Sequence, residues 1–209
     1  MRKRRARPVY DATVRYTDVD GKLVTVSAKI TTRGNSRLAL CDFPPLRLDF
    51  KRKVAKETLF AGQEKLKLVT RCKRTRAYAG YLQAEFIIYR AYNLLTDNSF
   101  RVRMLEIDYL NDSGGVYRQS DVGFFLEDKR SVAARTGLDN IKIKNLRPDS
   151  LDARSLNRYS VFQYLVGNTD WAVQAGAGDD DCCHNGILLG EEGSDGDWIP
   201  CPTILIRPG

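Results

Sequence analysis

The chain has 209 residues, 43% of them hydrophobic and 10% aromatic, which suits one domain or two closely packed lobes with an ample core. Disorder is therefore not the default expectation for this composition. Lys and Arg (34) outnumber Asp and Glu (26), and the formal net charge of +8 permits an acidic partner such as a nucleotide, a nucleic acid or an anionic membrane.

No segment approaches the length of a transmembrane helix. The basic start, Arg2–Arg5, is not followed by the apolar stretch of a secretory signal. We therefore expect either a cytoplasmic protein or a native start elsewhere.

The first third of the chain predicts an antiparallel sheet. Val9–Thr17 and Leu23–Ile30 are β-branched, alternate in polarity and flank a turn, which is typical of a hairpin. Leu46–Phe50 alternates apolar and charged residues, which predicts a third strand with one buried face. Lys51–Lys56 is expected to be a solvated turn, and Lys65–Thr70 a fourth strand.

A polar turn rich in hydrogen-bond donors, Thr31–Arg37, follows the second strand. It has two interpretations, a surface loop with a basic flank or a turn that faces a phosphate. In the second, Gly34 lets the backbone approach an anion, and Arg33 or Arg37 pairs with that anion.

The clearest predicted element is a mostly buried helix from Tyr78 to Thr96. Its apolar positions recur at helical spacing, namely Leu82, Phe86, Tyr89 and Asn93, widened by Ile87, Ile88, Ala91, Leu94 and Leu95. Glu85 lies beside this stripe, and a buried carboxylate needs a partner. A structural salt bridge would supply one, and so would the lysine–glutamate pair that positions nucleotide phosphates in a kinase.

The remaining elements are predicted in a simple order. Phe100–Tyr109 and Tyr117–Glu127 form a second hairpin. Lys129–Gly137 is a short helix closed by its glycine, Leu138–Ser150 is a charged connector, and Ser155–Val166 is an amphipathic helix.

The segment after that helix contains the candidate chemistry. Asp170 is followed about fifteen residues later by Asn185, at the mouth of an apolar run. Phosphoryl-transfer sites use such a spacing, because one group orients a hydroxyl while an amide and a carboxylate hold Mg²⁺. The alternative is that both residues only form loops. We do not expect Cys182, Cys183 and His184 to bind a metal, because neighbouring side chains on an extended segment point to opposite faces.

Eight segments carry a family resemblance, from about Tyr10 to Asp197. They resemble a group of uncharacterised bacterial proteins related to the CotH-type (spore-coat) atypical protein kinases. The segments are RGNSR, CDFPPLRLDF, KLKLVTRCK, YLQAEFIIYRAYNLLT, FRVRMLEIDY, GFFLEDK, FQYLVGNTDW and CCHN.

The resemblance implies an α+β, divergent two-lobe protein-kinase-like fold. The N-lobe, about 9–128, would be an antiparallel sheet plus the long helix, and an incomplete C-lobe would occupy about 129–200. Residues 1–8 would be a basic tail, and 201–209 an aberrant one.

The same resemblance implies a site for ATP and Mg²⁺ and a protein or peptide substrate whose hydroxyl accepts the phosphoryl group. Asp170 would be the catalytic aspartate, and Asn185 would support Mg²⁺. Glu85 would pair with Lys67 or with its competitor Lys51. The turn near the nucleotide would comprise Arg33, Gly34, Asn35 and Ser36, and Phe125–Glu127 would lie near the adenine, with Glu127 at the hinge.

The chain departs from this family after the CCHN segment. The family continues with Pro-Tyr-Asp-Phe-Asp, whose carboxylates bind the metal, whereas this chain reads Pro200-Cys-Pro-Thr-Ile-Leu. Back-translating Cys201–Pro208 and restoring one nucleotide gives Val-Pro-Tyr-Asp-Phe-Asp-Ser-Ala, so we expect a frameshifted, C-terminally truncated member. Without both acids, charge neutralisation on the phosphates is lost and this chain is expected to be inactive. An in-frame read of the source DNA would refute the frameshift.

Alternatives remain for compartment, cysteines and function. Relatives of this type are usually exported or in the cell envelope, and in an exported parent Cys41 and Cys72 could form a disulfide. Two reduced core thiols are favoured for the chain as given. The other functions are a kinase-like scaffold without catalysis and a basic module that binds nucleic acid or another anion through 51–76. Nucleic acid is not the expected partner, because few aromatic residues interleave with those basic residues.

Overall fold

We describe a computed structural model of the chain, covering residues 7–34, 36–144, 146–176 and 181–204, without the side chains of Ser36 and Pro148. The chain divides into two compact units. The first contains the residues up to 79 and 103–128, and the second contains 80–102 and the residues from 129 onward. Among the described residues, no helix has the length and apolar character that crossing a bilayer requires.

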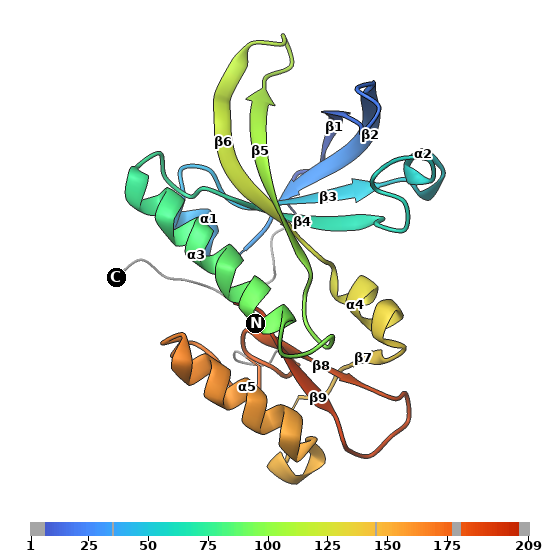
Figure 1. Cartoon of the computed structure of the whole chain (residues 1–209), viewed down its shortest axis with the longest axis vertical. Helices are drawn as coiled ribbons and strands as arrows, with labels where there is room; N and C mark the ends of the chain where they lie inside the picture. The colour runs from blue at the N-terminus through green and yellow to red at the C-terminus, as the bar shows by residue number, and fades with distance from the viewer. Residues whose placement is uncertain (1–6, 35, 145, 177–180, 205–209) are drawn as a thin grey trace. The chain divides into compact units, whose positions relative to one another are not determined.

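The first unit contains a six-stranded sheet in the order β1-β2-β3-β4-β6-β5. Figure 1 shows β5 and β6 as a long hairpin. The pairs from β1 to β4, and β4 with β6, are antiparallel, so the predicted mixed α and β architecture with an antiparallel sheet is confirmed. The strands are β1 Tyr10–Thr17, β2 Leu23–Thr32, β3 Leu46–Phe50, β4 Lys65–Thr70, β5 Val102–Leu110 and β6 Val116–Leu126.

Alternation along the strands builds the core of this unit. Leu48 and Phe50 of β3 are buried together with Leu66 and Leu68 of β4, while the lysines of β4 occupy its other face. The ring of Phe60 stacks on that of Phe50, with 4.3 Å between the centroids. The predicted alternation of both strands is therefore confirmed.

The predicted solvated turn at Lys51–Lys56 is wrong in one respect. Arg52–Ala55 is a short helix, α2, whose basic side chains are exposed while Ala55 is buried in the core. The turn at Thr31–Arg37 likewise ends early, because helix α1 (Ser36–Leu40) begins inside it. Neither helix was predicted, since each is too short for a helical period to be recognised.

A disulfide joins Cys41 and Cys72, so the favoured prediction of two reduced thiols is wrong in this structure. The disulfide flanks β3 and β4, and the backbone N–H of Phe43 donates to the carbonyl of Cys72. The Phe43 ring lies 4.6 Å from the guanidinium of Arg118, which pairs with Asp121 at 3.0 Å. Both charged side chains are almost fully buried, and burial is tolerated because each has a charged partner.

The second unit combines helices with a three-stranded sheet in the order β7-β8-β9. Asn140 of β7 donates its side-chain N–H to the carbonyl of Leu188 in β8, at 3.1 Å. The elements of this unit are α3 Arg76–Asn93, α4 Lys129–Thr136, β7 Asp139–Ile141, a 3-10 turn at Pro148–Ser150, α5 Ala153–Leu165, β8 Gly186–Gly190 and β9 Ile199–Pro202. The first turn of α3, residues 76–79, belongs to the first unit, and the rest of the helix belongs to the second.

Helix α3 is less buried than its sequence predicts. Leu82, Glu85, Tyr89 and Tyr92 are buried, whereas Ile87 is 62% exposed. The helix ends at Asn93, whose side-chain N–H groups donate to Ser99 and to the carbonyl of Phe100. The predicted continuation to Thr96 is therefore wrong, and the two leucines that were expected to widen the buried face, Leu94 and Leu95, are exposed beyond the helix.

Candidate functional site

The loop that carries Asp170 is fastened to the end of α5. Gly167 has φ +63°, a left-handed conformation that glycine adopts without strain and that ends the helix. The Asn168 amide side chain donates to Oε1 of the buried Gln163 at 3.0 Å. Its own Oδ1 accepts the backbone N–H of Asp170 at 3.1 Å, an Asx turn that places this aspartate.

Asn185 reaches across to this loop from the start of β8. Its Nδ2 donates to the backbone carbonyl of Asp170 at 2.6 Å and to the carboxylate Oδ2 at 2.9 Å. Both partner atoms on Asp170 are hydrogen-bond acceptors, so the amide nitrogen of Asn185 must face Asp170. The amide oxygen of Asn185 then points to other groups. The two residues that the sequence placed about fifteen positions apart are thus in direct contact.

His184 completes the cluster, and the sequence analysis missed this contact. Its Nε2 lies 2.9 Å from Oδ1 of Asp170, and the two side chains are 33% and 27% exposed. Neighbouring residues on an extended segment point apart, but Asn185 has φ +52°. This left-handed conformation, which asparagine tolerates better than most residues, lets His184 and Asn185 reach the same carboxylate. The sequence signal was a lone histidine beside a candidate asparagine.

Backbone hydrogen bonds hold the segment 182–185 on both sides. The N–H of Cys182 donates to the carbonyl of Ile143 at 2.6 Å, and the N–H of His184 donates to that of Ala175 at 3.1 Å. The N–H of Thr203, just after β9, donates to the carbonyl of Asn185 at 2.9 Å. The cluster around Asp170 therefore depends on three separate parts of the second unit.

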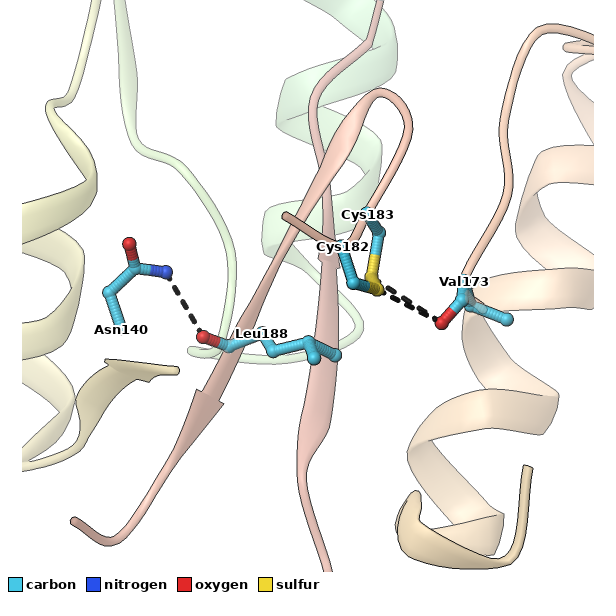
Figure 2. Close-up of a disulfide and its surroundings, with 5 residues drawn as sticks. All are labelled: Asn140, Val173, Cys182, Cys183 and Leu188. Carbon is cyan, nitrogen blue, oxygen red and sulfur yellow. Dashed lines mark hydrogen bonds between the residues drawn. A yellow bond between two sulfur atoms is a disulfide. The ribbon is translucent and has the colours of Figure 1, made fainter. Parts of the chain in front are cut away.

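A disulfide joins the neighbouring residues Cys182 and Cys183. Figure 2 shows their sulfur atoms side by side, facing the carbonyl oxygen of Val173. The expectation that these two side chains point to opposite faces is therefore wrong, because the covalent bond brings them together. In the described part of the chain, no group of three or more His, Cys, Asp or Glu residues is arranged to hold a metal ion.

The predicted nucleotide-binding residues are spread over both units. Lys67 lies in β4 opposite Leu126, and Lys51 is exposed just before α2. Glu127, directly after β6, is 7% exposed, and Glu85 on α3 is 4% exposed. Glu85 is thus buried, as predicted. The lysines and Glu127 belong to the first unit and Glu85 to the second, so the lysine–glutamate pair stays a prediction.

The turn predicted to face a phosphate is held by Arg7. The Arg7 guanidinium donates to the carbonyls of Thr32 at 2.9 Å and Gly34 at 2.7 Å, although the sequence assigns Arg7 to a basic tail. Gly34 has φ +91°, as a turn that requires glycine would, and the N–H of Arg33 donates to the carbonyl of Pro45. Asn35 and the side chain of Ser36 lie outside what the structure describes.

The residues around Asp170 do not by themselves fit a magnesium site. Mg²⁺ in kinase sites is held by carboxylates together with substrate phosphates in an octahedron. Here Asp170 supplies one carboxylate and Asn185 one amide oxygen. The stretch where the resembled family has two further acids begins in β9, where Cys201 and Pro202 are fully buried. The donor set is incomplete, so we derive no step through the metal.

Comparisons of the chain with protein-family models, with curated proteins and with solved structures found no significant match.

Proposed function

We propose that this chain is a CotH-like atypical kinase domain with a divergent two-lobe fold, whose intact parent transfers a phosphoryl group from ATP to a protein or peptide hydroxyl. The contact between Asp170 and Asn185 carries the proposal. A carboxylate that accepts a substrate hydroxyl proton must be partly open to solvent and held in one orientation. Asp170 is 27% exposed, and both of its carboxylate oxygens are fixed by neighbours.

The remaining roles follow the kinase plan. Lys67, or Lys51 in its place, would position the nucleotide phosphates with Glu85, and the turn of Arg33, Gly34 and Ser36 would lie beside them. Glu127 would mark the segment that meets the adenine. The buried state of Glu85 supports this proposal, because a carboxylate that is 4% exposed needs a charged or hydrogen-bonding partner.

This sequence supplies too few acids to neutralise the phosphate charges. One carboxylate and one amide oxygen leave most positions of a magnesium octahedron to water and substrate. We therefore propose that the chain as written does not turn over ATP, and that activity requires the Tyr-Asp-Phe-Asp stretch of the restored reading frame.

The test is thermal unfolding with and without Mg-ATP on two matched proteins. One has Val-Pro-Tyr-Asp-Phe-Asp at 201–206 and continues in the restored frame, and the other carries Asn at both new acids. A ligand that binds only the folded state raises the melting temperature. We expect a rise for the acid version alone, and Asp170→Asn in that version should abolish peptide phosphorylation while keeping the rise.

A non-catalytic kinase-like scaffold is the second candidate, favoured by the burial of Pro200, Cys201 and Pro202 in β9. If both matched proteins fold and neither is stabilised by Mg-ATP, the kinase proposal fails and the scaffold stands.

A further inference from the structure

The disulfide between Cys182 and Cys183 directly precedes the two residues that hold Asp170. Cys183 is bonded through its backbone to His184, and Asn185 comes next. A bond between neighbouring side chains restricts the backbone torsions between them. The orientation of the peptide entering His184 is therefore tied to the oxidation state of the cysteines.

The surroundings of the sulfur atoms suit thiols. The carbonyl oxygen of Val173 lies 3.1 Å from Sγ of Cys182 and 3.5 Å from Sγ of Cys183, as Figure 2 shows. Disulfide sulfurs carry no hydrogen, so in the oxidised state these contacts are not hydrogen bonds. A thiol is a donor, although a weak one. Reduction therefore places a donor beside an acceptor that is already in position.

Backbone hydrogen bonds couple the two cysteines to the cluster around Asp170. The N–H of Gly186 contacts the carbonyl of Cys183 at 3.4 Å, and the residues between them are His184 and Asn185. Ala172, two residues after Asp170, bonds through its N–H to the carbonyl of His184. A change of torsion at Cys183 is thus transmitted directly to the contacts of Asp170.

We propose that Cys182–Cys183 is a site of reversible thiol–disulfide exchange with dithiols, and that its reduction loosens the hold of His184 and Asn185 on Asp170. The site would act as a redox control on the partly exposed carboxylate of Asp170. This inference concerns the geometry of the cluster and does not require nucleotide binding or phosphoryl transfer.

The exchange balances with a dithiol as the reductant. A thiolate of the dithiol attacks Sγ of the half-buried Cys183, the protein S–S bond breaks, and buried Cys182 leaves as a thiolate that takes up a proton. The second thiol of the reagent then attacks the mixed disulfide and releases Cys183. The protein gains two electrons and two protons, and the dithiol is oxidised to its own disulfide.

The disulfide between Cys41 and Cys72 makes a useful contrast. It spans 31 positions of sequence, so it restricts the unfolded chain, whereas Cys182–Cys183 spans 1 and closes no chain loop. Loop entropy therefore gives Cys182–Cys183 no stabilising role, and a local effect on the residues that follow is what remains.

The experiment uses the only histidine of the chain as a reporter. We would record the imidazole signals of the full chain by NMR, first oxidised, then with dithiothreitol, then after reoxidation, with alkylation and mass spectrometry to identify the reduced cysteines. We expect the His184 signals to move on reduction and to return on reoxidation. The Cys41→Ser/Cys72→Ser variant should respond as the parent does.

A second variant separates the sites. Cys182→Ser/Cys183→Ser should show the reduced-state signals from the start and should not respond to dithiothreitol. The proposal is overturned if Cys182 and Cys183 become alkylated while the His184 signals stay in place, or if this pair resists dithiothreitol in the folded protein. Because no nucleotide is present, failure of the kinase proposal leaves this result unaffected.

Discussion

Asn185 shows how one backbone angle brings two neighbouring side chains to one carboxylate. At φ +52° its amide donates twice to Asp170 while His184, one residue earlier, contacts the other carboxylate oxygen. Residues other than glycine with a positive φ are frequently found at functional sites. The cluster therefore requires asparagine for both its side chain and its backbone.

Replacing Asn185 separates these two contributions. Asn185→Ala loses both hydrogen bonds and adds the cost of a left-handed alanine, so we expect the free energy of unfolding to fall by about 2–4 kcal/mol. Asn185→Gly loses the same hydrogen bonds without the steric cost. Its free energy of unfolding should therefore fall by about 1 kcal/mol less than that of Asn185→Ala. Urea denaturation of both variants measures this, and equal losses would show that the backbone angle carries no strain.

At this scale the sequence predicted a relation between residues but not its geometry. The residue types and spacing of Asp170 and Asn185 indicated a shared site, and the structure brings them into contact. The part played by His184 could not be predicted, because it depends on a backbone angle at the next residue. The partnership of Arg7 with Gly34 was equally hidden, since the sequence shows only a run of basic residues before a strand.

Helix α5 begins with a side-chain cap that the sequence analysis overlooked. Oδ1 of Asp152 accepts the backbone N–H of Ser155 at 2.8 Å. Hydrogen bonds from the Ser155 side chain and, second, from this backbone N–H lower the pKa of the Asp152 carboxyl below its usual range. A capping residue of this kind satisfies an N–H at the first turn of the helix.

The cap makes the stability of α5 depend on pH. The pKa of Asp152 is lower in the folded state, so its charge stabilises the fold above the unfolded pKa of about 4, and that contribution disappears as the pH falls through the folded value. Asp152→Ala should lower the free energy of unfolding by about 1 kcal/mol at pH 7. Asp152→Asn, which keeps an acceptor, should be less stable than the parent at pH 7 and approach it near pH 3, as followed by denaturation. If the difference in free energy of unfolding between Asp152→Asn and the parent does not change with pH, the charge effect is contradicted.

Replacing either of two glycines by alanine should change the stability of the protein, with opposite signs at the two positions. Gly80 lies within α3 with nothing within 4 Å of an added Cβ, so Gly80→Ala should stabilise the helix by about 0.5–1 kcal/mol. An added Cβ at Gly190, at the end of β8, would overlap Cδ1 of the buried Trp198. Gly190→Ala should therefore destabilise the protein by about 1–3 kcal/mol. Thermal unfolding compares the two, and changes of the same sign would refute this account.

The elements that the sequence predicted well are those with a readable period. The helix at Ser155–Val166 and the strand at Lys65–Thr70 are found within two residues of their predicted bounds. Strand β7 has three residues, which is too few to show alternation, and β9 contains Pro200 and Pro202, which argue against a strand. Both were missed because long-range pairing to β8 holds them in place.

Across the whole molecule, the two disulfides should differ in their effect on stability. For a sequence separation of 31, the chain-entropy relation gives about 3–4 kcal/mol of stabilisation from Cys41–Cys72. Cys41→Ser/Cys72→Ser should lose about that amount, while Cys182→Ser/Cys183→Ser, which frees no chain loop and only loosens the contacts of Asp170, should lose less. Guanidinium unfolding of both variants against the oxidised parent checks this. A larger loss for the neighbouring pair would contradict the entropic argument.

The two prolines of β9 also decide which backbone groups the far side of this strand has to satisfy. The N–H groups of a strand alternate in direction, and the N–H of Thr203 points to Asn185 on the β8 side. Residues 200 and 202 therefore face away from β8, and both are prolines, which have no N–H to offer. Both prolines are fully buried, so an N–H at either position would need a hydrogen-bond partner inside the protein. With proline at both positions, this side of β9 has two fewer buried donors to pair.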